Sequence, residues 1–205
     1  MAGKAFWSLG VVLLTLAVAV AQENRSEVSI QGTGFFTSSV SNTNGGASNY
    51  SATNTGGFLG TYRYHLNRFW SVEGAYGFDR NSQLYTVPSD LFRIQSNVHQ
   101  FTGALVLNLR SGAHSKISPY LLMGGGAVRF QPSSDQFNSL SGAAGQTRGA
   151  FVYGAGLNYV LHKGISLRAE YRGLIYSTPD FGFGSLATNT VTHTAEPSVG
   201  LSFRF

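Results

Sequence analysis

The sequence predicts an all-β fold, an eight-stranded antiparallel up-and-down transmembrane β-barrel that follows a cleavable signal peptide. Charged residues make up only 11% of the chain, against roughly 25% in soluble domains, so something other than water covers much of the surface. Eight segments alternate apolar or glycine residues with mixed residues. Beyond the amino-terminal stretch, no segment reaches the roughly 18 apolar residues of a spanning helix, which leaves a closed barrel as the way to cross a bilayer.

The amino end has the pattern of a secretory signal. Lys4 supplies a positive charge, residues 11–20 form an apolar run, and small residues before Gln22 fit a cleavage site. We therefore expect two parts, a signal peptide over 1–21 and one barrel domain over 22–205. A retained anchor helix is the alternative, but the run is shorter than the roughly 20 apolar residues that a helical span needs.

The strands are expected in eight segments separated by alternating short and long connections. The segments lie near Glu27 to Ser38, Thr55 to His65, Phe69 to Asn81, Val98 to Arg110, Ile117 to Gln131, Arg148 to His162, Gly164 to Ser177 and Val191 to Phe205. The long connections, rich in Ser, Asn, Thr and Gly, are Ser39 to Asn54, Ser82 to Asn97, Pro132 to Thr147 and Thr178 to Thr190. Strict alternation predicts short periplasmic turns, longer external loops and both termini on the periplasmic side.

The alternation also separates a lipid face from a lumenal face. In the third segment, Trp70 and Val72 share the outward face, while Ser71 and Glu73 point inward. The inward charges are then Glu73, Arg168, Glu170, Arg172, Glu196 and Arg204, with Arg63 and Arg129 as further candidates. Since an eight-stranded barrel is narrow enough for side chains to fill it, we expect each glutamate to find an arginine and the lumen to be plugged. A gated ion path is the alternative function of the same residues.

The carboxyl-terminal strand carries apolar residues at every second position. They are Val199, Leu201, Phe203 and Phe205. This tail resembles the recognition signal of bacterial outer-membrane barrels, which implies the barrel assembly machinery as a partner.

The chain over residues 26–205 resembles the small eight-stranded outer-membrane barrel family, which includes the transmembrane domain of outer-membrane protein A. Segments 119–126, 153–159 and 167–172 look like the family's fifth to seventh strands. The resemblance implies the bacterial outer membrane, and members of the family serve as envelope stabilisers, adhesins or barrels of unknown role. No carboxyl-terminal peptidoglycan-binding domain is found, so a direct tether to the cell wall is not implied.

We expect no catalytic, cofactor or metal site. His193 and Glu196 are three residues apart in one strand and fall on opposite faces, and His162 with Ser166 lies at a periplasmic turn. A lipid A-modifying enzyme is therefore the least favoured hypothesis. Gly124 to Gly126 lack the Lys-Ser/Thr of a phosphate loop, so close strand packing or a bend explains them better, and they mark the likeliest bulge.

The function predicted from these patterns is a non-enzymatic outer-membrane barrel with an envelope structural or surface-interaction role. Its partners are outer-membrane lipid, the assembly machinery and a surface ligand bound through external loops, where Tyr85, Phe92 and Phe137 are aromatic tips. A small ion or solute channel is the alternative. The formal charge of +5 is scattered and has no basic run, so nucleic acid is not expected.

Overall fold

The computed structural model describes residues 25–41, 48–87, 90–109, 116–133 and 142–205. The expected signal peptide, residues 1–21, lies outside them. The strands are β1 (Ser26–Thr37), β2 (Val40–Ser41), β3 (Asn49–Ala52), β4 (Thr55–His65), β5 (Trp70–Val87), β6 (Asp90–Asn108), β7 (Ile117–Pro132), β8 (Gln146–His162), β9 (Ile165–Ser177) and β10 (Val191–Arg204). A 3-10 turn, η2, covers Gly184–Leu186. Among the described residues, no helix is long and apolar enough to cross a membrane.

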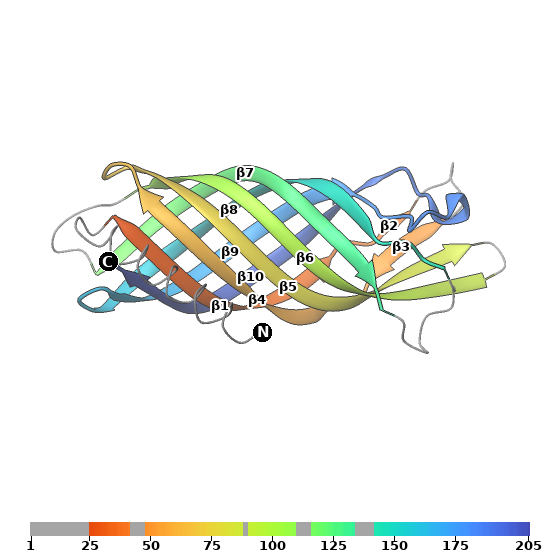
Figure 1. The fold of residues 1–205 in the computed structure, drawn as a ribbon, viewed down its shortest axis with the longest axis horizontal. Helices are drawn as coiled ribbons and strands as arrows, with labels where there is room; N and C mark the ends of the chain where they lie inside the picture. Colours follow the sequence, from red (N-terminus) through yellow and green to blue (C-terminus); the bar gives the residue numbers. More distant parts are fainter. Residues whose placement is uncertain (1–24, 42–47, 88–89, 110–115, 134–141) are drawn as a thin grey trace, which may run out of the picture.

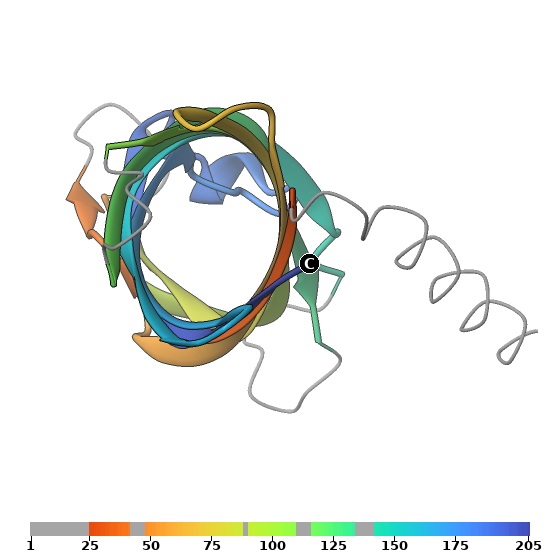
Figure 2. The same cartoon turned by 90° about the vertical axis from the view of Figure 1, so that its left-hand side faces the viewer.

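Eight of these strands close into the predicted antiparallel barrel. The order around the ring is β5-β4-β1-β10-β9-β8-β7-β6, and β6 pairs back with β5. Figure 2 looks along the barrel and shows the strands as a closed ring. The first and last strands meet in register, with Val28 opposite Phe203 and Ile30 opposite Leu201. Because the ring is closed, every strand has a neighbour on both sides.

The two ends of the barrel differ (Figure 1). One end holds the carboxyl terminus and the short connections, and we call it the turn end. The other holds β2, β3 and the far ends of β5 and β6, and we call it the loop end. The connections at the loop end are longer than those at the turn end except between β5 and β6, where only 88–89 separate the two strands, so the predicted strict alternation is wrong at that connection.

The prediction of a long loop over Ser82 to Asn97 is wrong, because most of this segment is strand. β5 and β6 stay paired through Val87 opposite Asp90, and β3 adds to the edge of β5, with Tyr50 opposite Tyr85. This segment is rich in the aromatic and β-branched residues that favour strands, and its polar residues conceal that propensity.

Inward and outward residues alternate along the strands as predicted. In β5, Trp70 and Val72 are exposed and Ser71 and Glu73 are buried. Large apolar side chains cover the outer surface all round the ring, among them Phe58, Tyr62, Phe101, Met123, Leu157, Leu167, Val199, Leu201 and Phe203. This exterior suits lipid and not water.

The predicted bulge at the three glycines is also wrong. Pairing runs without a shift through Gly124 and Gly126, and the irregularity lies between Val160 and His162 of β8. A Cβ on Gly124 would come within 2.0 Å of the Gly103 carbonyl oxygen, and one on Gly126 within 2.0 Å of that of Phe101. Close strand approach therefore accounts for both glycines.

Candidate functional site: the lumen

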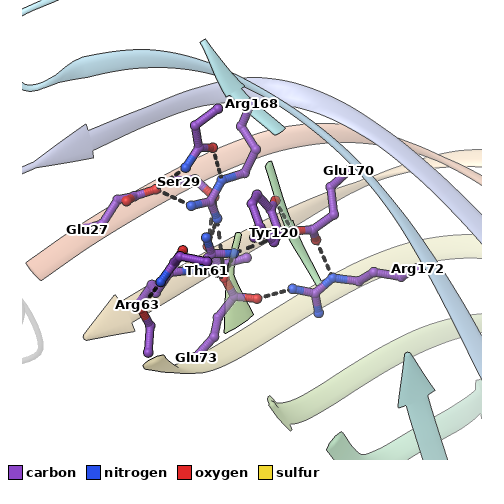
Figure 3. A network of polar contacts seen from close by, with 12 residues as sticks. Glu27, Ser29, Thr61, Arg63, Glu73, Tyr120, Arg168, Glu170 and Arg172 are labelled. Carbon is purple, nitrogen blue, oxygen red and sulfur yellow. Dashed lines mark hydrogen bonds and ion pairs between the residues drawn. The ribbon is translucent and has the colours of Figure 1, made fainter. Parts of the chain in front are cut away.

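The turn-end half of the lumen holds a network of ion pairs centred on Glu73 of β5 (Figure 3). Arg63 on neighbouring β4 donates from Nε to Glu73 Oε2 at 2.8 Å, and Arg168 on β9 donates from Nη1 to the same oxygen at 3.3 Å. Arg172, also on β9, donates to Oε1. All four side chains are buried. Since β5 and β9 lie four strands apart in the ring, these contacts cross the barrel.

Glu170 of β9 forms a second centre. Its Oε1 accepts a hydrogen bond from Arg172 Nε at 2.5 Å, and its Oε2 accepts one from the hydroxyl of Tyr120 on β7. The guanidinium carbon of Arg63 lies 4.1 Å from the centre of the Tyr120 ring. A cation over an aromatic face is attracted to it, so Tyr120 connects β7 to both charges.

Glu27 of β1 forms the third centre and binds Arg168. The other donors of Arg168 are also used, because Nε reaches Asn158 Oδ1 at 3.0 Å and Nη1 reaches Thr61 Oγ1 at 3.1 Å and Ser29 Oγ at 3.3 Å. Three carboxylates thus meet three guanidinium groups. A buried pair is stable only when such hydrogen bonds offset its desolvation.

A hydrogen-bonded series, Ser71–His65–Glu27, lies beside the network at the turn end. The distance from Ser71 Oγ to His65 Nδ1 is 2.8 Å, and that from His65 Nε2 to Glu27 Oε2 is 3.1 Å. The order is that of a nucleophile, a base and an acid. Ser71 is fully buried, however, and its Oγ also accepts a hydrogen bond from Asn108 Nδ2 at 2.9 Å. These contacts connect the barrel wall and leave no open approach to Ser71.

The structure brings most of the predicted lumenal charges together. Glu73, Arg168, Glu170 and Arg172 meet in the network, and Arg63 joins them. The sequence did not single out Glu27, Tyr120, His65 or Asp79. Glu27 and Tyr120 each have the inward phase of their strand, with buried Ser29 and Leu122 two residues further on, so the alternation could have found them.

Three of the predicted charges are placed differently. Glu196 is buried, but its Oε1 accepts a hydrogen bond from Gln100 Nε2 at 2.6 Å, where an arginine was expected. Arg204 has the inward phase of β10 but is exposed at the turn-end mouth, because the strand ends there. Arg129 is exposed between buried Val128 and Phe130, so it points outward.

The loop-end half of the lumen is filled by apolar and aromatic side chains. They are Phe35, Tyr50, Tyr85, Ile94, Phe130, Tyr176, Phe181 and Leu186. The predicted loop tip Tyr85 is fully buried here, Phe92 packs against this cluster, and Phe137 lies outside the described residues. A partner therefore has no free Tyr85 side chain to bind.

The segment between β9 and β10 folds over this mouth. Phe181, at φ 53°, packs edge to face on Tyr85 and Phe130 with ring centres 6.4 and 6.3 Å apart. Asp180 accepts hydrogen bonds from Gln146 Nε2 at 2.6 Å and from Arg148 Nη2 at 3.1 Å. Partial burial raises the pKa of Asp180, but these bonds, the Gly182 N–H and the Arg148 charge outweigh it and hold that pKa below its ordinary value. The carboxylate is thus kept ionised.

Three further histidines of the described residues, His99, His162 and His193, lie at the outer surface or at the turn end, and His114 lies outside the described residues. His99 and His193 are hydrogen-bonded at 2.9 Å to the hydroxyls of Tyr76 and Tyr153, and His162 is exposed at the turn end. Within the described residues, no group of three or more His, Cys, Asp or Glu is arranged to hold a metal.

A family model for the outer membrane protein beta-barrel domain matches residues 8–205. This chain belongs to that family. The match and the closed ring confirm the predicted resemblance, the eight-stranded fold and the bacterial outer-membrane location. By the usual arrangement of bacterial outer-membrane barrels, we expect the turn end to be periplasmic and the loop end external.

Solved structures share the architecture at low identity. The outer membrane protein OprG from Pseudomonas aeruginosa is 16% identical, with a TM-score of 0.59 over 88% of this chain and 96% of OprG. Neisserial surface protein A is 17% identical, with a TM-score of 0.57 over 87% and 97% of the two chains. The outer membrane protein AlkL is 19% identical, with a TM-score of 0.51 over 88% and 90%. A search of curated proteins finds no match.

Proposed function

We propose that this protein is a non-enzymatic outer-membrane barrel with a closed lumen, serving the envelope as a structural element or a surface for interaction. The observation that carries the proposal is the ion-pair network across the periplasmic half, where Arg63, Arg168 and Arg172 are each no more than 1% exposed. The aromatic cluster fills the external half independently. Since the ion-pair network and the aromatic cluster each block the lumen, a continuous aqueous path through the barrel is not expected.

Planar-bilayer recording tests the closed lumen against the alternative, a small ion or solute channel. We expect no stable unitary conductance from the purified, folded barrel. A triple variant, Glu73→Ala/Arg172→Ala/Phe181→Ala, is the positive control. It removes one charge of each sign from the network and one ring from the aromatic cluster, so it shows whether the recording detects an opened barrel. Stable unitary conductance in the unaltered protein, changed by substituting Arg168 or Arg172, would overturn the proposal.

Lipid analysis tests the non-enzymatic part. The mass spectrum of host lipid A is expected to be unchanged when the protein is expressed. A new deacylated or acylated species, lost in Ser71→Ala or His65→Ala, would show instead that the buried Ser71–His65–Glu27 series acts on lipid.

The proposed partners are membrane lipid, the barrel assembly machinery and a surface ligand at the external loops. The outward apolar residues Val199, Leu201 and Phe203 of β10 support the first two, since they are exposed where lipid or an assembly factor would meet them. We expect Phe205→Ala to lower the amount of heat-modifiable barrel in the outer membrane, while Leu91→Ala, an exposed change elsewhere, leaves it unaltered. Equal amounts in both variants would argue against the terminal signal.

A further inference from the structure

The buried charges of the lumen do not balance. Five carboxylates and three guanidinium groups are buried among the described residues. The ion-pair network uses Glu27, Glu73 and Glu170 with all three arginines. Asp79 and Glu196 are left over and bring two formal negative charges into the barrel.

The two excess carboxylates lie at one level of the lumen, on the external side of the network. Gln100 of β6 pairs with Gly77 of β5, and Asp79 is the next inward position along β5, so Gln100 and Asp79 are diagonal neighbours whose Cα atoms lie about 7–8 Å apart. Glu196 comes from β10, four strands away in the ring, and accepts the Gln100 hydrogen bond across the lumen at 2.6 Å. Gln100 therefore binds one carboxylate and lies diagonal to the other along the neighbouring strand, and Asp79 and Glu196 are close enough to repel each other electrostatically.

Four oxygen atoms of these three side chains accept no hydrogen bond from the residues that the structure describes. They are Asp79 Oδ1, Asp79 Oδ2, Glu196 Oε2 and Gln100 Oε1. Gln100 is only 2% exposed, and its amide nitrogen already points at Glu196, so its carbonyl oxygen is a buried acceptor within the same cluster. Arg172 is electrostatically favourable to Glu196, but it donates to Glu170, Glu73 and Thr102. Buried acceptors and charges without partners are costly.

We infer that Asp79, Glu196 and Gln100 bind a hard cation inside the barrel. Carboxylate and amide oxygens are the ligands that Ca²⁺ prefers, and water completes its coordination of six to eight oxygens. A single divalent ion matches the two excess charges, which neither a water molecule nor a monovalent ion does. With two carboxylates as its only charged ligands, the site binds such an ion in a partly hydrated form.

Terbium luminescence tests the site, because Tb³⁺ replaces Ca²⁺ and is excited through nearby tyrosines. Tyr50 and Tyr176 are close enough to Asp79 to interact with it electrostatically. The barrel is folded into detergent after treatment with a chelator and titrated with Tb³⁺. We expect saturable emission that Ca²⁺ displaces, and at least tenfold weaker binding in Asp79→Asn/Glu196→Gln. Asp90→Asn, which alters an exposed carboxylate at the external end, is the matched control and binds like the unaltered protein.

Two results would overturn the inference. One is equal Tb³⁺ binding by the double variant and the unaltered barrel, because the ion would then lie elsewhere. The other is an infrared band of a protonated carboxylic acid at neutral pH that disappears in Glu196→Gln or Asp79→Asn, because protons would then quench the excess charge. Heat-modifiability of each variant shows that it is folded, and the single Glu196→Gln change serves if the double variant is not. Neither readout depends on whether the barrel conducts.

Discussion

Each buried guanidinium of the network depends on carboxylates supplied by other strands. Glu73 accepts hydrogen bonds from three arginines, so neutralising it leaves three buried charges under-compensated. Removing one partner of a buried pair is far more costly than the pair is stabilising. The residue to alter is therefore Glu73.

Glu73→Gln is expected to lower the free energy of unfolding by about 3–5 kcal/mol, as for other broken buried pairs. Reversible urea unfolding in lipid vesicles, followed by tryptophan fluorescence, measures it. The control Asp90→Asn removes an exposed carboxylate and should stay within about 0.5 kcal/mol. Equal effects of the two changes would mean that water screens the network.

Sequence periodicity predicts which face a residue occupies but not which partner it meets. It placed Glu73, Arg168, Glu170 and Arg172 inward, where they are buried. The predicted arginine partner of Glu196 was wrong. Contacts across the lumen depend on the stagger between strands, which the two-residue alternation within one strand does not determine. Alternation places Tyr120 inward, but its contacts with Arg63 and Glu170 on other strands could not be predicted, for the same reason.

Among the elements, the pairing of β1 with β10 closes the ring. It is interrupted between Thr33 and Phe36, opposite Pro197, which has no amide hydrogen to donate. On the periplasmic side of this interruption, Gly200 allows the strands to approach closely, since a Cβ there would lie 2.0 Å from the Ile30 carbonyl oxygen. The seam thus depends on a glycine at this position.

Gly200→Val is expected to prevent normal closure of the barrel. Unboiled protein on a gel should lose most of its compact, fast-migrating band. Gly74→Ala is the matched control, because a Cβ at Gly74 meets nothing within 4 Å, and it should leave the band intact. A normal band in Gly200→Val would show that β1 and β10 can separate without loss of the fold.

The segment between β9 and β10 is expected to respond to acid in a defined way. The pKa of Asp180 is lowered in the folded protein, so its bonds contribute stability above its unfolded pKa of about 3.9 and lose it as the pH falls through the folded value. Amide exchange of Gly182, whose N–H donates to Asp180 at 3.0 Å, measures this. Corrected protection should be constant down to about pH 4 and absent at all pH values in Asp180→Ala, which has no side-chain acceptor. Loss of protection in a mildly acidic range would assign the effect to another group.

At the scale of the molecule, composition and alternation were enough to predict the closed barrel and its eight strands. They were insufficient at the external end, where β5 and β6 extend beyond the predicted strand ends and Tyr85 turns into the lumen. In the bilayer every backbone N–H and C=O must be paired, so a segment with alternating apolar residues has to form a strand there. Outside it that constraint is relaxed, and polar residues such as Ser82 and Asn97 occur in strand and loop alike.

The expected orientation of the barrel, with the loop end outside the cell, can be tested by labelling. The chain has no cysteine, so single cysteines introduced at exposed positions report their side of the membrane without background. Asp90 lies at the external end and Lys163 in the turn between β8 and β9, and both are exposed. A membrane-impermeant maleimide should label Asp90→Cys in intact cells and Lys163→Cys only after the outer membrane is permeabilised. The opposite pattern would reverse the barrel, place the Phe181 segment in the periplasm, and leave the short turns as the surface available to partners outside the cell.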